Sequence, residues 1–149
     1  MTIKDRLYNS CEEYLETRIQ RISKLLKDLE DDMENEGKSS AGDKFETGRE
    51  MMSAEWNKLS KQLIEFKQQK QTLNLAKRRQ SSKTVQLGSL VKTSASNYFI
   101  SISSGKIKLE DKLFYAIGAN SPIARLLLGK SEGSEFEFNK TKNTILSVE

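Results

Sequence analysis

The chain of 149 residues contains no histidine, one cysteine (Cys11) and one proline (Pro122). Histidine is the side chain that most often serves as a general base or a metal ligand near neutral pH. Its absence therefore excludes a histidine-based hydrolase triad and a histidine-ligated zinc site. A single cysteine excludes an intrachain disulfide and is typical of proteins from a reducing compartment.

Long apolar runs and aromatic residues are scarce as well. No segment approaches the roughly 18 apolar residues of a membrane span, and residues 1–5 become charged without the apolar core of a signal peptide. We therefore expect a cytoplasmic protein that does not contact a membrane. Aromatic residues make up 7% of the chain and charged residues 31%, which favours a solvated, extended element joined to one small domain.

The charges are distributed unevenly along the chain, although their sum is only +4. Residues 28–50 contain nine acidic and three basic side chains, a net charge of −6. Residues 51–83 contain eight basic and two acidic side chains, a net charge of +6. An acidic segment repels nucleic acid unless a metal ion mediates the contact, whereas a basic segment attracts it.

Two heptad patterns predict an antiparallel coiled-coil hairpin at residues 1–79, with helices at about 3–36 and 45–79. Breaker residues at about 37–46 mark its tip, and each arm would be roughly 45 Å long. Alternatively, the apolar stripe could mediate homodimerisation, in which case the two helices would not fold back on each other. The apolar positions are Leu15, Ile19, Ile22, Leu26, Leu29 and Met33 in the first helix, preceded by Leu7, Cys11 and Tyr14, and Met52, Trp56, Leu59, Leu63, Phe66 and Leu73 in the second, interrupted by the polar Lys70.

The composition changes after a linker at residues 80–83, and residues 84–149 predict a small α+β domain with an antiparallel sheet. Alternation at residues 98–103 and 135–138 and an apolar run at 113–117 indicate strands, and residues 144–148 are expected to form the last one. One short helix is expected in between. Ser121 is a suitable N-cap, Pro122 suits the first helical position, and Gly129 is a suitable C-cap.

Two segments of the chain resemble the Gre family of bacterial transcription elongation factors. Residues 120–130 read N-S-P-I-A-R-L-L-L-G-K and are similar to the family segment N-S-P-[IL]-[AG]-x-A-L-[IL]-G-K, with Leu126 at the usual alanine. Gly42, Asp43 and Glu46 match the start of the family tip, G-D-L-x-E-N-A-E-Y. The resemblance covers the whole chain, because a coiled coil followed by a small sheet domain is the layout of the family.

The resemblance implies an FKBP-like C-terminal domain that docks on RNA polymerase at its secondary channel. It also implies that Asp43 and Glu46 reach the polymerase active site, where they share a Mg²⁺ ion and stimulate cleavage of backtracked RNA. The chain would be a monomer with no stably bound cofactor, would meet the RNA 3′ end only indirectly, and would not be an enzyme by itself. The candidate docking residues are Ser121, Pro122, Arg125 and, if exposed, Ile123 and Leu127.

Departures from the family tip leave both acids in place but keep an alternative open, a regulator that occupies the secondary channel without stimulating cleavage. Thr47 and Gly48 replace asparagine and alanine, and Arg49 occupies an otherwise acidic position from which it could pair with Glu46. Asp43 with Glu46 also fits a helix-capping box, which is compatible with metal binding inside the polymerase.

The basic run Lys77, Arg78 and Arg79 suits the C-terminus of a helix, and contact with nucleic acid is its second interpretation. Two further functions stay open for the chain as a whole. A peptidyl-prolyl isomerase or chaperone would need an aromatic-lined pocket built from some of Tyr98, Phe99, Phe114, Tyr115, Phe136 and Phe138. A coiled-coil scaffold would leave the paired acids at the tip without a role.

Overall fold

The computed structural model describes the backbone of residues 1–37 and 43–149 and the side chains of residues 1–35 and 48–149. Contacts divide the chain into two compact units, which are described separately. Unit 1 comprises Met1–Tyr14 and Lys70–Glu149, and unit 2 comprises Leu15–Gln69. The sequence pattern separated residues 1–79 from 84–149, whereas the contacts group both ends of the helical segment with the C-terminal residues. No helix in the described part of the chain carries an apolar stretch that could cross a bilayer.

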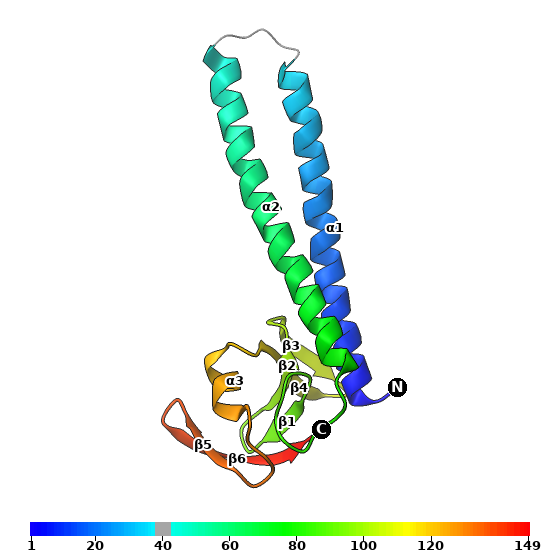
Figure 1. The fold of residues 1–149 in the computed structure, drawn as a ribbon, viewed down its shortest axis with the longest axis vertical. Helices are drawn as coiled ribbons and strands as arrows, with labels where there is room; N and C mark the ends of the chain where they lie inside the picture. Colours follow the sequence, from blue (N-terminus) through cyan, green and yellow to red (C-terminus); the bar gives the residue numbers. More distant parts are fainter. Residues whose placement is uncertain (38–42) are drawn as a thin grey trace. The chain divides into compact units, whose positions relative to one another are not determined.

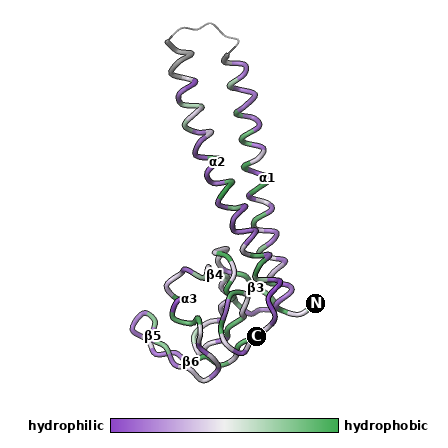
Figure 2. Tube along the Cα trace, in the orientation of Figure 1, coloured by the Kyte–Doolittle hydropathy of each residue, from purple (hydrophilic) through white to green (hydrophobic). Residues whose placement is uncertain are grey.

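Unit 2 is the predicted helical hairpin, formed by parts of α1 (Ile3–Gly37) and α2 (Asp43–Arg78) (Figure 1). Apolar positions recur along both helices (Figure 2), as a coiled-coil seam requires. Its buried centre consists of Ile22, Leu26 and Leu59, against which Leu29, Trp56, Leu63 and Phe66 pack. All seven residues belong to the predicted heptad positions, so the seam is confirmed in this part of the chain.

The predicted seam of α2 has one polar interruption, at Lys70. Lys70 is exposed, whereas Gln69 is partly buried and its Oε1 finds no hydrogen-bond partner among the described atoms. Of these two adjacent polar residues, the partly buried side chain is therefore that of Gln69.

The start of α1 is fixed by a reciprocal capping box. The backbone N–H of Thr2 donates to Asp5 Oδ2 at 3.0 Å, and the backbone N–H of Asp5 donates to Thr2 Oγ1 at 3.0 Å. Two otherwise unpaired N–H groups of the first turn are satisfied in this way. Hydrogen bonding from the Thr2 backbone N–H, and secondly from the Thr2 side chain, holds the pKa of the Asp5 carboxyl below its usual range. This contribution to stability is therefore present above the pKa of an unfolded aspartate and is lost as the pH falls through the lowered pKa.

Unit 1 contains a six-stranded sheet in the order β3-β4-β2-β1-β6-β5. The α+β class and the single short helix, α3 (Pro122–Leu127), are confirmed (Figure 1). The sequence missed the edge strand β3, in which charged lysines alternate with only two large apolar residues. The strands are β1 (Leu90–Thr93), β2 (Asn97–Ser101), β3 (Gly105–Leu109), β4 (Lys112–Gly118), β5 (Glu135–Phe138) and β6 (Thr141–Val148).

The sheet is mixed, so the expectation of an antiparallel sheet is wrong for one pair of strands. β2 and β4 run parallel, with Tyr98 beside Tyr115, while the other pairs are antiparallel. The chain leaves β2 and forms β3, which runs in the opposite direction and leaves room for one strand between the two. A tight turn at Glu110 and Asp111, both at positive φ, then leads into β4, which fills that position. Periodicity reports which face a side chain occupies but not the direction of its neighbouring strand, and for this reason the parallel pair was not predicted.

Different helices pack on the two faces of the sheet. On one face, α3 contributes Ile123, Ala124 and Leu127 to a cluster that also contains Ile100 and Ile145. On the other face, the first turns of α1 pack on β2, with the rings of Tyr8 and Phe99 in a T-shaped contact at 4.8 Å between centroids. Cys11 was expected to be a seam residue of the coiled coil. It is buried beside the sheet instead, with its Sγ 3.8 Å from the Oγ of Ser101.

The burial of Tyr8 gives a testable dependence of stability on pH. Burial, with a smaller contribution from Cys11, raises the pKa of the Tyr8 phenol to about 12, whereas an unfolded tyrosine ionises near pH 10. Between these values the unfolded state releases a proton that the folded state keeps, so we expect the free energy of unfolding to fall as the pH rises. Urea unfolding measured from about pH 9 to pH 11.5 should show a smaller fall for Tyr8→Phe than for the wild type. Equal falls in both proteins would contradict this assignment.

Candidate functional site

The acidic end of the helical hairpin is the first candidate site. The backbone of α2 begins at Asp43, but the side chains of Asp43 and Glu46 lie outside the described residues. Within the described side chains, no three acidic, cysteine or histidine residues gather as a metal site. The described acids nearby on α1 are exposed, and they are Asp28, Glu30, Asp31, Asp32 and Glu34.

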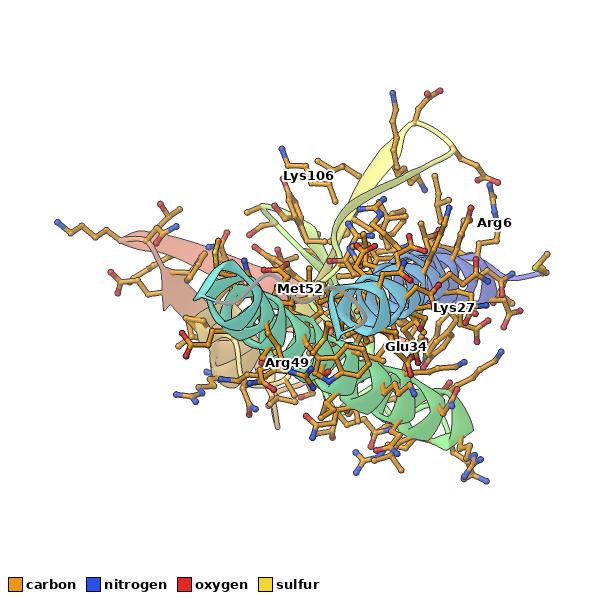
Figure 3. The ribbon with its side chains drawn as sticks, turned by 90° about the horizontal axis from the view of Figure 1, so that it is seen from above. Arg6, Lys27, Glu34, Arg49, Met52 and Lys106 are labelled. Carbon is orange, nitrogen blue, oxygen red and sulfur yellow. The ribbon has the colours of Figure 1, made fainter. Side chains whose placement is uncertain are left out.

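An open hollow of about 540 Å³ lies between the two helices of unit 2. Carboxylates from α1 and a guanidinium from α2 line it, and Glu34 and Arg49 extend on the same side of the two helices (Figure 3). Trp56 was expected in the core, and it both packs on the buried seam and lines this hollow. The sequence did not indicate the hollow. Trp56 is its one distinctive lining residue, and the heptad pattern assigned Trp56 to the seam. The lining residues are Glu30, Met33, Glu34, Arg49, Ser53, Trp56 and Asn57.

The predicted docking helix α3 has the expected local structure. The Oγ of Ser121 accepts a hydrogen bond from the Ala124 N–H at 3.3 Å and donates one to the Gly118 carbonyl at 2.8 Å. Pro122 holds the first helical position, and Gly129, at a φ of +83°, follows the C-cap residue Leu128. The predicted N-cap is therefore confirmed, whereas the predicted C-cap Gly129 lies one residue beyond the C-cap, Leu128.

The structure divides the five predicted docking residues into buried and exposed members. Ile123 and Leu127 are 7% and 0% exposed and belong to the core of the domain. Pro122 and Arg125 are exposed, and Ser121 is half-buried because it caps the helix. Exposure was the condition for assigning a docking role to the two aliphatic residues, so Pro122 and Arg125 are the members available at the surface.

A groove of about 500 Å³ beside α3 is a second hollow that the sequence did not indicate. Its lining side chains among the described residues are aromatic, aliphatic or neutral polar. Recognising it from the sequence would have required the β2–β4 pairing, since only this pairing places Tyr98 beside Tyr115. The lining residues are Ala95, Ser96, Tyr98, Tyr115, Ile117, Ile123, Phe138, Asn139, Thr141 and Asn143.

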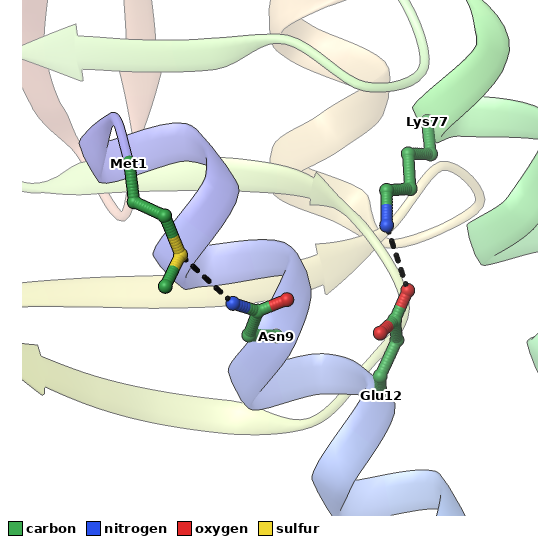
Figure 4. Close-up of polar contacts among 4 residues, drawn as sticks. All are labelled: Met1, Asn9, Glu12 and Lys77. Atoms are coloured by element: carbon green, nitrogen blue, oxygen red, sulfur yellow. Dashed lines mark hydrogen bonds and ion pairs between the residues drawn. The ribbon is translucent and has the colours of Figure 1, made fainter.

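The basic run at the end of α2 is exposed, as expected for a solvated helix end. Lys77, Arg78 and Arg79 are all exposed, and two of them lie in the last turn of the helix, where cations interact favourably with its dipole. The Lys77 Nζ donates to Glu12 Oε1 at 3.2 Å (Figure 4). One member of the run therefore has an ion-pair partner within unit 1.

The buried thiol of Cys11 contributes to packing. Burial raises the pKa of the Cys11 thiol, with its hydrogen-bonding contacts to Ser104 and Ser101 acting in the opposite direction. A nucleophilic cysteine requires a lowered pKa and an accessible thiolate, and Cys11 is 0% exposed. This environment fits a structural residue at the junction of α1 and the sheet.

Comparison with known proteins adds no family to these observations. No model of a known protein family matches the chain, and no curated protein matches its sequence.

Proposed function

We propose that the chain is a Gre-type transcription elongation factor that binds RNA polymerase at the secondary channel and brings Asp43 and Glu46 to the polymerase active site. The observation that carries the proposal is the combination of elements in one chain. The second helix of a helical hairpin begins at Asp43, in the sequence Gly42-Asp43-x-x-Glu46, and an α+β domain bears the Ser121-Pro122 helix.

In this proposal the chain supplies charge and position to a catalytic centre of its partner. One or two carboxylates together with water and phosphate oxygens are the usual ligands of Mg²⁺ in proteins. When bound, the ion supplies an activated water and stabilises the leaving oxygen. Asp43 and Glu46 would hold it, and the exposed Pro122 and Arg125 on α3 are the candidate contacts that dock the domain.

The proposal includes an FKBP-like arrangement of residues 84–149, a monomeric state and a cytoplasmic location. The short helix packed on one face of a six-stranded sheet supports the FKBP-like arrangement. The narrow apolar seam of unit 2, which is filled by residues of both helices, supports a hairpin that folds back on itself in a monomer.

A regulator that occupies the secondary channel without stimulating cleavage is the second candidate function. It is favoured by Arg49, which is exposed on α2 and lies three residues after Glu46, hence on the same side of a helix. A cation at this position lowers the attraction of the acidic end for Mg²⁺.

Cleavage of RNA in a backtracked elongation complex tests the first candidate. We expect the wild type to accelerate release of the 3′ fragment in Mg²⁺, and Asp43→Asn/Glu46→Gln to lose at least about tenfold of this acceleration, as expected when metal ligands are removed. The matched control is Asp31→Asn/Glu34→Gln, which removes two exposed acids with the same spacing from α1. This control should retain the acceleration.

Binding to polymerase is measured in parallel to separate the two candidates. A wild type that binds polymerase but leaves the cleavage rate unchanged would support the regulator. A wild type that does not bind would reject both functions.

A further inference from the structure

Tyr98, Tyr115 and Lys106 form one row across three neighbouring strands of unit 1. Tyr98 of β2 is the register partner of Tyr115 of β4, and Tyr115 is the register partner of Lys106 of β3. Register partners project from the same face of a sheet. The two tyrosine rings lie 6.1 Å apart and are tilted by 35°, so they form a continuous aromatic surface next to a cation.

The adjacent row of the sheet adds a second lysine and an aliphatic side chain to this surface. Lys108 of β3 pairs with Leu113 of β4, whose side chain is 41% exposed. Both lysines are exposed, and the side chain of Lys106 extends from the sheet into solvent (Figure 3). The surface therefore has aromatic and aliphatic side chains at its centre and two ammonium groups on the edge strand.

Tyr98 and Tyr115 also form one wall of the neutral groove beside α3. Asn139 and Thr141 from the β5–β6 hairpin line the same groove. Amide and hydroxyl groups at this position can hydrogen-bond the edge of a planar ligand that lies on the aromatic wall. An uncharged groove next to exposed lysines fits a ligand with a planar apolar body and an anionic backbone.

Four carboxylates lie on β5 and on the turn between β3 and β4. Glu110 forms an ion pair with Arg6 at 2.7 Å, and Asp111 lies at the tip of the β3–β4 turn. On β5, Glu135 and Glu137 alternate with Phe136, which packs in the cluster under α3. Because alternate residues of a strand point to opposite faces, both glutamates project away from the groove.

We propose that this surface, defined by Tyr98, Tyr115, Lys106 and Lys108 with the adjoining groove, binds single-stranded nucleic acid. Bases stack on the tyrosine rings, which accept any base because every base has a π-face. The two lysines contact phosphates, whose negative charge they neutralise. A duplex cannot present an unstacked base to the rings, so the surface distinguishes single strands from double strands.

The proposal is independent of the proposed role at RNA polymerase, because binding of an oligonucleotide requires only this chain. The probes are fluorescein-labelled 12-nucleotide oligo(U) and oligo(A), and the competitor is a duplex of the same length. Fluorescence anisotropy with the full chain is recorded over a range of salt concentrations. We expect both single strands to bind, and the duplex to compete less well than an unlabelled single strand.

The lysines and the tyrosines are tested by different readouts. Lys106→Gln/Lys108→Gln should make the slope of log affinity against log salt shallower by about 1.4, since each phosphate contact with a single strand contributes about 0.7. Loss of a stacking ring in Tyr115→Leu should weaken binding roughly 5- to 100-fold. Tyr115→Phe, which keeps the aromatic face, should bind like the wild type and so separates stacking from loss of fold.

Two control variants locate the site. Lys58→Gln/Lys61→Gln removes the same charge from exposed positions of α2 in unit 2 and should leave the salt slope unchanged. Arg78→Gln/Arg79→Gln tests the basic run at the end of α2. The proposal is overturned if this last variant, and not the lysine pair of β3, removes binding, or if the duplex competes as well as a single strand. It is also overturned if the wild type binds no oligonucleotide, or if an uncharged apolar peptide fills the groove and binds equally well without the two lysines.

Discussion

Replacing Phe99 by alanine is expected to lower the free energy of unfolding by about 3–5 kcal/mol, the usual cost of removing a large buried aromatic side chain. Phe99 is 0% exposed on β2, which has β1 on one side and β4 on the other. Its ring also meets Tyr8 of α1 in the T-shaped contact at 4.8 Å. Because small domains are stable by only about 5–15 kcal/mol, this loss is a large share of the total. Urea unfolding followed by circular dichroism measures it.

Phe138→Ala is the matched control, since Phe138 is a half-buried phenylalanine on the edge strand β5. We expect it to cost less than about 2 kcal/mol, and equal losses in the two variants would contradict the central role of Phe99.

A double-mutant cycle with Tyr8→Leu and Phe99→Leu should give a coupling of about 0.5–1.5 kcal/mol for the ring pair. Trp56, the single tryptophan of the chain, lies in unit 2. Its fluorescence therefore reports separately on whether the hairpin unfolds at the same urea concentration.

Elements governed by short-range signals could be predicted from the sequence. The heptad spacing located the seam residues Ile22, Leu26 and Leu59 of unit 2, because helical periodicity fixes which side chains share a face. The Ser121-Pro122 pair located the start of α3, because capping depends only on residues within one turn. Both kinds of signal act within a few residues and therefore leave a pattern in the sequence.

The arrangement of the sheet depends on pairings between distant residues, and it could not be predicted in full. The row of Tyr98, Tyr115 and Lys106 exists only because β4 lies between β2 and β3 and runs parallel to β2. Ile123 and Leu127 have the exposure of core residues because α3 packs with one face on the sheet, which its sequence did not distinguish from a docking face. The side chains of Asp43 and Glu46 lie outside the described residues, and their role stays a prediction from the resemblance.

Gly88 lies where three parts of unit 1 meet, in the segment that leads from α2 to β1. Its backbone N–H donates to the carbonyl of Ile100 on β2 at 2.7 Å. A Cβ atom at this position would lie 2.9 Å from the carbonyl oxygen of Ala76 on α2 and 3.0 Å from the hydroxyl of Tyr8 on α1. Its φ of +94° is one that side chains with a Cβ rarely adopt. The absence of a side chain therefore lets the segment pass between the sheet and the ends of both helices.

Gly88→Ala is expected to lower the free energy of unfolding by about 2–5 kcal/mol, the sum of about 1–2 kcal/mol for the left-handed backbone and about 1–3 kcal/mol for the close contacts. Gly105→Ala is the control, because Gly105 has a similar φ of +86° and no atom within 4 Å of its would-be Cβ. It should show only the backbone part of the loss, so urea unfolding of the two variants separates conformational strain from steric overlap. If Gly88→Ala costs no more than Gly105→Ala, the helix ends and the segment before β1 do not pack as tightly as this geometry requires. A larger cost for Gly88→Ala would mean that the close packing of α1, α2 and β2 at this junction requires a residue without a Cβ atom.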